Sequence, residues 1–135
     1  YSQQRLPDQS VKPEPRDEAL QRLYEAEQRG MSNADLTGVP PRVVRLINGV
    51  LENKADLDRS IEEASEHWSL DRMPPVDRTI LRIGLFELRF EPGTPAAVIV
   101  SEAVALAKTY STERSGSFVN GVLGHLAETE RSGER

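Results

Sequence analysis

The segment of residues 70–90, LDRMPPVDRTILRIGLFELRF, constrains the fold of this chain more than any other. Pro74 and Pro75 open a helix, because proline is well tolerated in the first helical turn. The residues that follow place apolar side chains on more than one side of that helix: Ile80, Ile83, Leu85, Phe86, Leu88 and Phe90. A helix that is apolar on several sides must be covered by several neighbours. The segment therefore predicts a central helix enclosed by other helices.

Three amphipathic segments precede the central one, each with apolar residues at the spacing of a helical face. Residues 16–29 predict the first helix, which Gly30 ends, and residues 40–51 predict the second. Residues 52–68 predict the third, whose other face is acidic and should repel RNA. The three apolar faces comprise Leu20, Leu23 and Tyr24; Val43, Val44, Ile47, Val50 and Leu51; and Leu57, Ile61, Ala64 and Trp68.

Two more helices are expected after the central one. A turn at residues 91–98 leads into a helix that ends near Tyr110, and a second turn at residues 111–117 leads into a last helix that begins at Phe118. No stretch alternates polar and apolar residues for long enough to form a strand. We therefore predict an all-α fold of about six or seven helices, whose short connections make neighbouring helices antiparallel.

The chain of 135 residues is long enough for one domain with a core. We expect residues 1–15, which are proline-rich and lack apolar periodicity, to form a flexible N-terminal arm. Residues 16–128 should form the helical domain, and residues 129–135 a flexible tail. No apolar run approaches the roughly 20 residues of a membrane span, and the polar first residues do not resemble a signal peptide.

The charge and the cysteine content narrow the function. The net charge of −5 is opposite to that of a protein with a broad basic RNA-binding face, so any RNA surface must be local or weak. The chain has no cysteine, which excludes disulfides and zinc held by thiolates and is consistent with a reducing cytosol.

Side chains suited to catalysis are sparse. His67 and His125 are the only histidines, and neither has acidic neighbours at a metal-binding spacing. No glycine-rich phosphate loop and no nucleophile elbow is present. Glu87 and Glu102 lie within apolar helices and are expected to be structural or solvated carboxylates. We predict that the protein is not an enzyme and binds neither cofactor nor metal.

The second half of the chain resembles a known family. Residues 70–126 carry Asp77 with Arg78, the pair LR at 81–82, FEL at 86–88, SEAVALAK at 101–108 and FVNGVL at 118–123, in an order and spacing that resemble the NusB family of transcription antitermination factors. The first half matches more loosely through ALQRLYEAEQRG at 19–30. The resemblance covers about residues 16–128.

The resemblance implies two packed small helical bundles and a cytoplasmic protein that catalyses no reaction. It also implies the partners: a boxA-type RNA, the small-subunit ribosomal protein NusE, and the RNA polymerase antitermination complex on ribosomal RNA operons. A homodimer remains possible, because proteins of this fold occur as monomers and as dimers.

The RNA-binding residues that the resemblance implies lie in two places. The first is the entry to helix 16–29, where the family has an arginine-rich stretch and this chain has only Lys12 and Arg16, with Glu14 between them. The second is the turn before the last helix, where Arg114, Ser117 and Phe118 could hold a phosphate and stack on a base. Solvated positions for the two arginines, and core packing for Phe118, are the alternatives.

The resemblance further implies that Tyr24, Asp77 and Arg78 contact NusE, with helix capping as the alternative for Asp77. We assign Asn120 and Gly121 to structure, as a buried amide and a close helix approach.

Two other functions remain open. The chain could be a diverged protein-binding module with weak or lost RNA binding, because its arm is poor in arginine. It could also be an RNA-binding domain related to that of ribosomal RNA cytosine methyltransferases, which share the fold.

Overall fold

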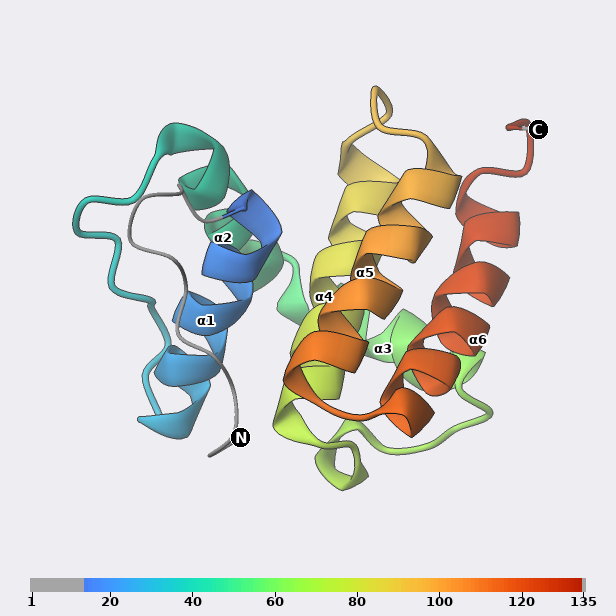
Figure 1. Ribbon diagram of the computed structural model, residues 1–135, viewed down its shortest axis with the longest axis horizontal. Helices are drawn as coiled ribbons and strands as arrows, with labels where there is room; N and C mark the ends of the chain where they lie inside the picture. Colours follow the sequence, from blue (N-terminus) through green and yellow to red (C-terminus); the bar gives the residue numbers. More distant parts are fainter. Residues whose placement is uncertain (1–13, 135) are drawn as a thin grey trace.

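The computed structural model describes residues 14–134, which form six α-helices and one short 3-10 helix, with no strand in this range (Figure 1). The all-α prediction is confirmed. The elements in chain order are α1 (Pro15–Gln28), α2 (Pro41–Glu52), α3 (Lys54–Ala64), the 3-10 helix η1 (Leu70–Arg72), α4 (Pro75–Phe90), α5 (Ala96–Tyr110) and α6 (Glu113–Glu130).

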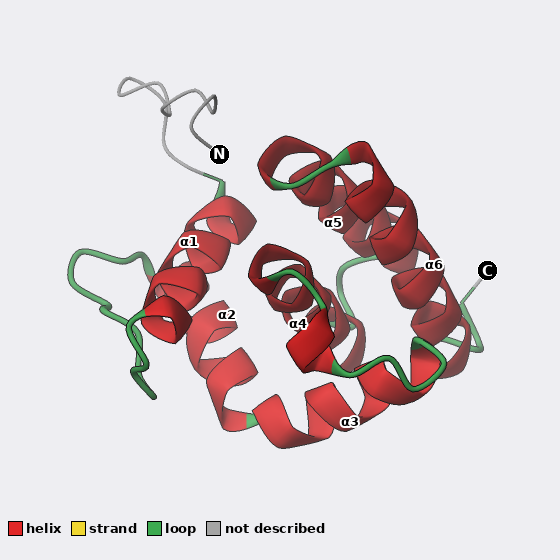
Figure 2. Ribbon diagram, turned by 90° about the horizontal axis from the view of Figure 1, so that it is seen from below, coloured by secondary structure: helices red, strands yellow, loops and turns green. Residues whose placement is uncertain are grey.

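The helices form two groups that meet at α4. Figure 1 shows α1 and α2 side by side in one group, while α4, α5 and α6 pack together in the other. The end-on view in Figure 2 places α4 in the middle, between the α1–α2 pair, α3 and the α5–α6 pair. Across residues 14–134, no helix combines the length and the apolar character that crossing a membrane requires.

The hydrophobic core is built around α4, as its sequence predicts. Every residue from Thr79 to Leu88 is buried, which places apolar side chains against neighbours on all sides. Phe90, the last residue of α4, is an exception because it is exposed at the helix end and packs its ring on Phe86. The other helices contribute one buried face each, including Leu20, Leu23, Val43, Ile47, Leu57, Ile61, Ile99, Leu106, Val119 and Leu123.

Two glycines allow the core helices to approach closely. A Cβ at Gly84 of α4 would lie 2.6 Å from Cδ1 of Leu123 in α6, and a Cβ at Gly49 of α2 would overlap the ring of Phe86.

The structural roles assigned to Asn120 and Gly121 are wrong. Asn120 is exposed, and a Cβ at Gly121 would meet no atom within 4 Å.

The prediction that Trp68 continues the apolar face of the third helix is wrong. Helix α3 ends at Ala64, and Glu66 (φ 57°) and His67 (φ 68°) adopt the left-handed conformation that reverses the chain. The single O–H of Ser65 is shared between the carbonyls of Glu62 and Trp68, at 3.2 and 3.4 Å, and so stabilises this turn. Trp68 therefore lies outside the helix, with 57% of its surface exposed.

Helix α6 is longer than expected at both ends. It begins at Glu113 rather than at Phe118, because Thr112 caps it by accepting a 3.0 Å hydrogen bond from the Ser115 backbone N–H. At the other end it continues to Glu130, two residues beyond the expected boundary at residue 128. Arg131 follows and donates to the carbonyls of Leu88, Glu91 and Thr94 at the turn between α4 and α5.

Candidate functional site

A groove of about 900 Å³ opens where the end of α3, the start of α4 and the first half of α6 meet. Its lining combines apolar and polar side chains, among them Trp68, Met73, Asp77, Arg114, Ser117 and Phe118. Hydroxyl groups of Ser111, Thr112 and Ser115 border it at the capped start of α6 and hydrogen-bond to one another.

The structure brings three of the predicted RNA-binding residues together in this groove. Arg114, Ser117 and Phe118 all line it, because residues three or four apart on a helix share one side. Arg114 and Ser117 are exposed, and Phe118 is half-buried. The Phe118 ring lies 6.4 Å from the ring of Trp68, with the two planes tilted by 50°.

Arg16, also predicted to bind RNA, occupies a different environment. Its Nε donates a 2.8 Å hydrogen bond to Oε2 of Glu87 in α4, and one terminal nitrogen donates a second, also of 2.8 Å, to Oε1. Burial lowers the pKa of Arg16, but the hydrogen bonds and negative charge of Glu87 outweigh it and raise that pKa above its usual value. Arg16 is thus a structural cation between α1 and α4, and Lys12 lies outside the described residues.

Glu87 matches its expected role as a hydrogen-bonded structural carboxylate, because it is buried against Arg16. Glu102 is exposed on α5, at the rim of a small cavity that Arg16 also lines. This cavity shares no lining residue with the groove at α6. The sequence could not pair Arg16 with Glu87, because the two residues are far apart along the chain.

The three residues predicted to contact NusE lie in different settings. Tyr24 is half-buried on α1. Arg78 points toward α1, where it pairs with Glu27, and donates to the carbonyls of Leu70 and Met73. Asp77 is buried in the groove lining, and its Oδ1 has no hydrogen-bond partner among the described residues. It makes no cap hydrogen bond at the start of α4, so the capping alternative is wrong.

A charged network that the sequence did not reveal surrounds Arg78. Arg82 donates to Glu27 in α1 and forms a two-point pair with Asp58 in α3, at 2.7 and 3.0 Å. Burial raises the pKa of Glu27, but hydrogen bonds from Arg78 and Arg82 outweigh it and lower that pKa overall. Helices α1, α3 and α4 are joined in this way.

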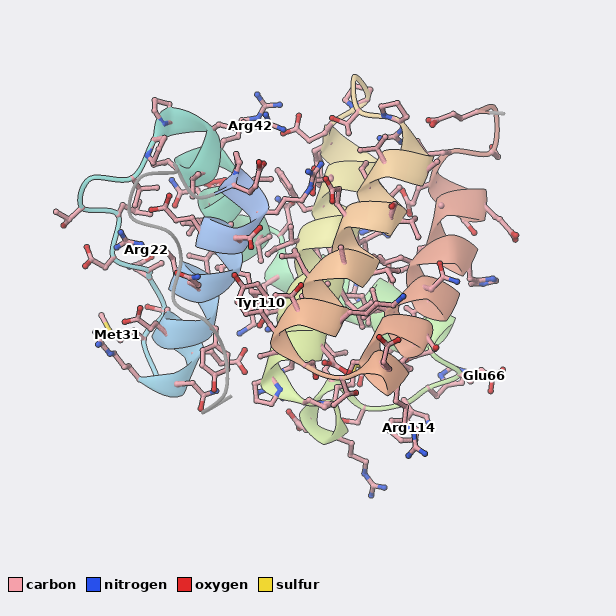
Figure 3. The ribbon with its side chains drawn as sticks, viewed as in Figure 1. Arg22, Met31, Arg42, Glu66, Tyr110 and Arg114 are labelled. Atoms are coloured by element: carbon pink, nitrogen blue, oxygen red, sulfur yellow. The ribbon has the colours of Figure 1, made fainter. Side chains whose placement is uncertain are left out.

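Charge is unevenly distributed around the groove. Glu63 and Glu66 lie on the side of α3 and its following turn, whereas Arg114 lies at the start of α6. Figure 3 shows Glu66 and Arg114 at the same end of the molecule, both directed outward, while Tyr110 lies between the two helix groups. The groove therefore offers one cationic position beside an aromatic surface, with an acidic opposite rim.

The family profile of NusB matches residues 13–128, which is most of the chain. The chain belongs to the NusB family. It is 44% identical over 132 residues to the transcription antitermination protein NusB of Arthrobacter sp. (strain FB24), covering 91% of this chain and 97% of that relative. It is 42% identical to the NusB of Sorangium cellulosum, covering 84% of this chain and 89% of the relative.

Solved structures of the NusB family share the fold. The NusB of T. maritima is 34% identical and superposes with a TM-score of 0.75, covering 87% of this chain and 93% of the other. A chain from a structure of antitermination factors NusB and NusE in complex with dsRNA is 26% identical, with a TM-score of 0.73. That alignment covers 85% of this chain and 94% of the other. The resemblance to the NusB family is confirmed.

Proposed function

We propose that the protein is a transcription antitermination factor that binds boxA-type RNA together with NusE, within the RNA polymerase antitermination complex of ribosomal RNA operons. The match to a chain solved with NusE and RNA carries this proposal, since it spans 85% of the protein. The alignments with the two antitermination proteins named above also support the proposal, because each covers most of the relative's own length. The protein acts by binding and catalyses no reaction.

We assign RNA contact to the start of α6. Arg114, in the first turn of α6, offers a guanidinium to a phosphate, and Ser117 offers a hydroxyl one turn further along the helix. Phe118 and Trp68 offer ring faces for stacking. We also assign RNA contact to Lys12, which precedes α1 in the sequence. So few cations predict weak binding without a partner, because the phosphate contribution scales with the number of charges neutralised.

We assign NusE contact to the side of α1 that carries Tyr24. Arg78 supports this surface without contacting NusE itself. Its pairing with Glu27 holds α1 against α4, and its bonds to Glu27 and to the Met73 carbonyl leave Arg78 few free donors. The pairing of Arg16 with Glu87 acts in the same way at the other end of α1.

A titration of fluorescently labelled boxA RNA, followed by anisotropy with and without saturating NusE, tests the proposal. We expect weak binding to the protein alone and a substantially lower Kd when NusE is present. Absence of RNA binding under both conditions, with a folded protein, would contradict it.

The second candidate is a protein-binding module that has lost RNA binding. The engagement of Arg16 by Glu87 and the acidic rim formed by Glu63 and Glu66 favour it. The same titration separates the two: NusE binding with no RNA binding in the ternary mixture would identify the second. A relation to the methyltransferase RNA-binding domains has less support, because the relatives named above are antitermination proteins.

A further inference from the structure

The residues that follow α6 lie against the turn between α4 and α5. Figure 1 shows the end of α6 beside that turn, whereas the groove lies at the start of the helix. Arg131, the first residue after α6, has a side chain that is only 10% exposed. Arginine is seldom buried to this extent unless its donors are paired. The partners of Arg131 therefore define the role of this segment.

Five acceptors surround Arg131, one for each N–H of its guanidinium. Nε donates to the Leu88 carbonyl at 2.7 Å. In an α-helix this carbonyl would accept from the residue four positions on, but that residue is Pro92, which has no N–H. Arg131 thus supplies the donor that α4 lacks at its end. The terminal nitrogens donate to the carbonyls of Glu87, Glu91 and Thr94 at 2.9–3.3 Å, and to the Glu134 carboxylate.

Glu134 joins Arg131 to the start of α5. Its Oε1 accepts a 2.6 Å hydrogen bond from the backbone N–H of Ala96, the first residue of α5, and its Oε2 accepts from Arg131. The first N–H groups of a helix have no partner within the helix and attract anions. Pro95, the residue before α5, has no side-chain oxygen that could cap it. The hydrogen bonds from Ala96 and Arg131 lower the pKa of Glu134.

The two charged side chains differ in how firmly they are held. Arg131 is buried and bonded to four carbonyls, whereas the Glu134 side chain is 37% exposed. A hollow of about 430 Å³ opens beside the carboxylate and is lined in part by Ala127 and Glu128 of α6. Glu134 can therefore leave its position without any change in the core, while Arg131 stays in place.

We propose that Arg131 and the start of α5 form a carboxylate-binding site, which the chain fills with its own Glu134. Residues 131–134 then act as a latch that closes this end of the helical bundle. Arg131 is the fixed half of the latch on α4, and Glu134 is the half that opens. An open latch leaves a cation and a helix N-terminus free for another carboxylate. This inference does not depend on the proposed RNA binding.

Hydrogen exchange at the Ala96 amide, followed by NMR, tests the Glu134 half. This amide has no acceptor within α5, so its protection reports the bond to Glu134. Glu134→Ala should raise its exchange rate about tenfold, because a hydrogen bond to a charged group is lost. The Ile99 amide, which bonds to the Pro95 carbonyl, should be unaffected. Glu128→Ala removes an exposed carboxylate from the same hollow and should leave both rates unchanged.

The variant Arg131→Lys tests the other half. Lysine keeps the charge but has three donors on one atom, so it cannot serve four carbonyls and a carboxylate. We expect the Tm to fall by about 5 °C or more. Arg42→Lys, the same change at an exposed position of α2 (Figure 3), should shift the Tm by less than about 2 °C. Equal shifts in the two variants would show that Arg131 does not hold the turn.

A titration with sodium acetate, against sodium chloride at equal ionic strength, tests the carboxylate site itself. In Glu134→Ala the Ala96 amide signal should shift with acetate and saturate, whereas in the unmodified protein Glu134 already fills the site. The same response in both proteins would overturn the inference, as would no response in either. Unchanged Ala96 exchange in Glu134→Ala would also overturn it, and residues 129–135 would then be the flexible tail that the sequence predicts.

The latch and the proposed function can fail separately. The latch lies at one end of α6 and the groove at the other, so Glu134→Ala should bind RNA with the Kd of the unmodified protein in the anisotropy assay. A changed Kd in this variant, with Glu128→Ala unchanged, would show that residues 131–134 belong to the RNA surface and are not an independent latch. Absence of RNA binding in every variant would remove the proposed function and leave the latch intact.

Discussion

Arg16 at the start of α1 and Glu87 near the end of α4 form a two-point ion pair, with both hydrogen bonds 2.8 Å long. The pair joins the α1–α2 group to α4, around which the core is built. The Arg16 side chain is only 14% exposed, so its guanidinium is largely removed from solvent. A cation that the family resemblance assigns to RNA thus has a structural role in this chain.

Removing one partner of this pair should destabilise the protein. Glu87→Gln leaves Arg16 charged and largely buried without its counterion, and we expect the free energy of unfolding to fall by about 3 kcal/mol in urea denaturation. Glu25→Gln, which disrupts an exposed pair with Arg29, is the matched control and should cost less than about 0.5 kcal/mol. Equal losses in both variants would show that the Arg16 pair has no special structural role.

The Glu27 network should make stability depend on pH. Arg78 and Arg82 lower the pKa of Glu27 in the folded protein, so its contribution to stability is present above about pH 4.5 and is lost as the pH falls through the lower, folded value. Glu27→Gln should therefore lower the free energy of unfolding at pH 7 by about 2–3 kcal/mol and weaken its acid dependence. Urea titrations between pH 7 and pH 3 provide the measurement. An unchanged pH profile in the variant would contradict this role.

The close approach of α4 and α6 makes Gly84 sensitive to substitution. Gly84→Ala would push a methyl group against Leu123, which is fully buried and cannot move aside, and should destabilise the protein by about 1–3 kcal/mol. Gly121→Ala places a methyl group in open space on α6. It should stabilise the protein by up to about 1 kcal/mol, because alanine has a higher helix propensity than glycine. Thermal unfolding of both variants measures the difference, and a stabilising Gly84→Ala would refute the packing described for the two helices.

Arg114 should contribute to RNA binding through a phosphate. Arg114→Glu is expected to weaken binding to all RNA sequences and to reduce the slope of log Kd against log salt by about one unit or more. Arg29→Glu, the same charge change at the exposed end of α1, controls for net charge. Anisotropy at several salt concentrations measures both. If the two variants lose affinity equally, Arg114 makes no local contact.

Much of the fold could be predicted from local patterns. The apolar residues of 80–88 on several sides of one helix indicated that α4 is central, and the prolines at 74 and 75 marked its start. Periodicity was sufficient because burial of apolar surface dominates where a helix lies in such a fold.

Features that depend on distant contacts could not be predicted. The pattern that placed Trp68 on a helix face is local, whereas the left-handed turn at Glu66 and His67 ends that helix before Trp68. Glu87 lies 71 residues from Arg16, and Asp58 lies 24 residues from Arg82, so only the fold brings these partners together. Among the predicted site residues, Arg114, Ser117 and Phe118 were grouped by the family resemblance, as a turn before the last helix. Their arrangement on one side of α6 could not be predicted, because the helix begins at Glu113 and not at Phe118.

In vitro transcription through a terminator placed downstream of boxA tests the central claim most directly. With RNA polymerase and NusE present, adding this protein should increase the fraction of transcripts that read through the terminator, and mutation of boxA should abolish the increase. Unchanged read-through with a folded protein at saturating concentration would contradict the proposed antitermination function.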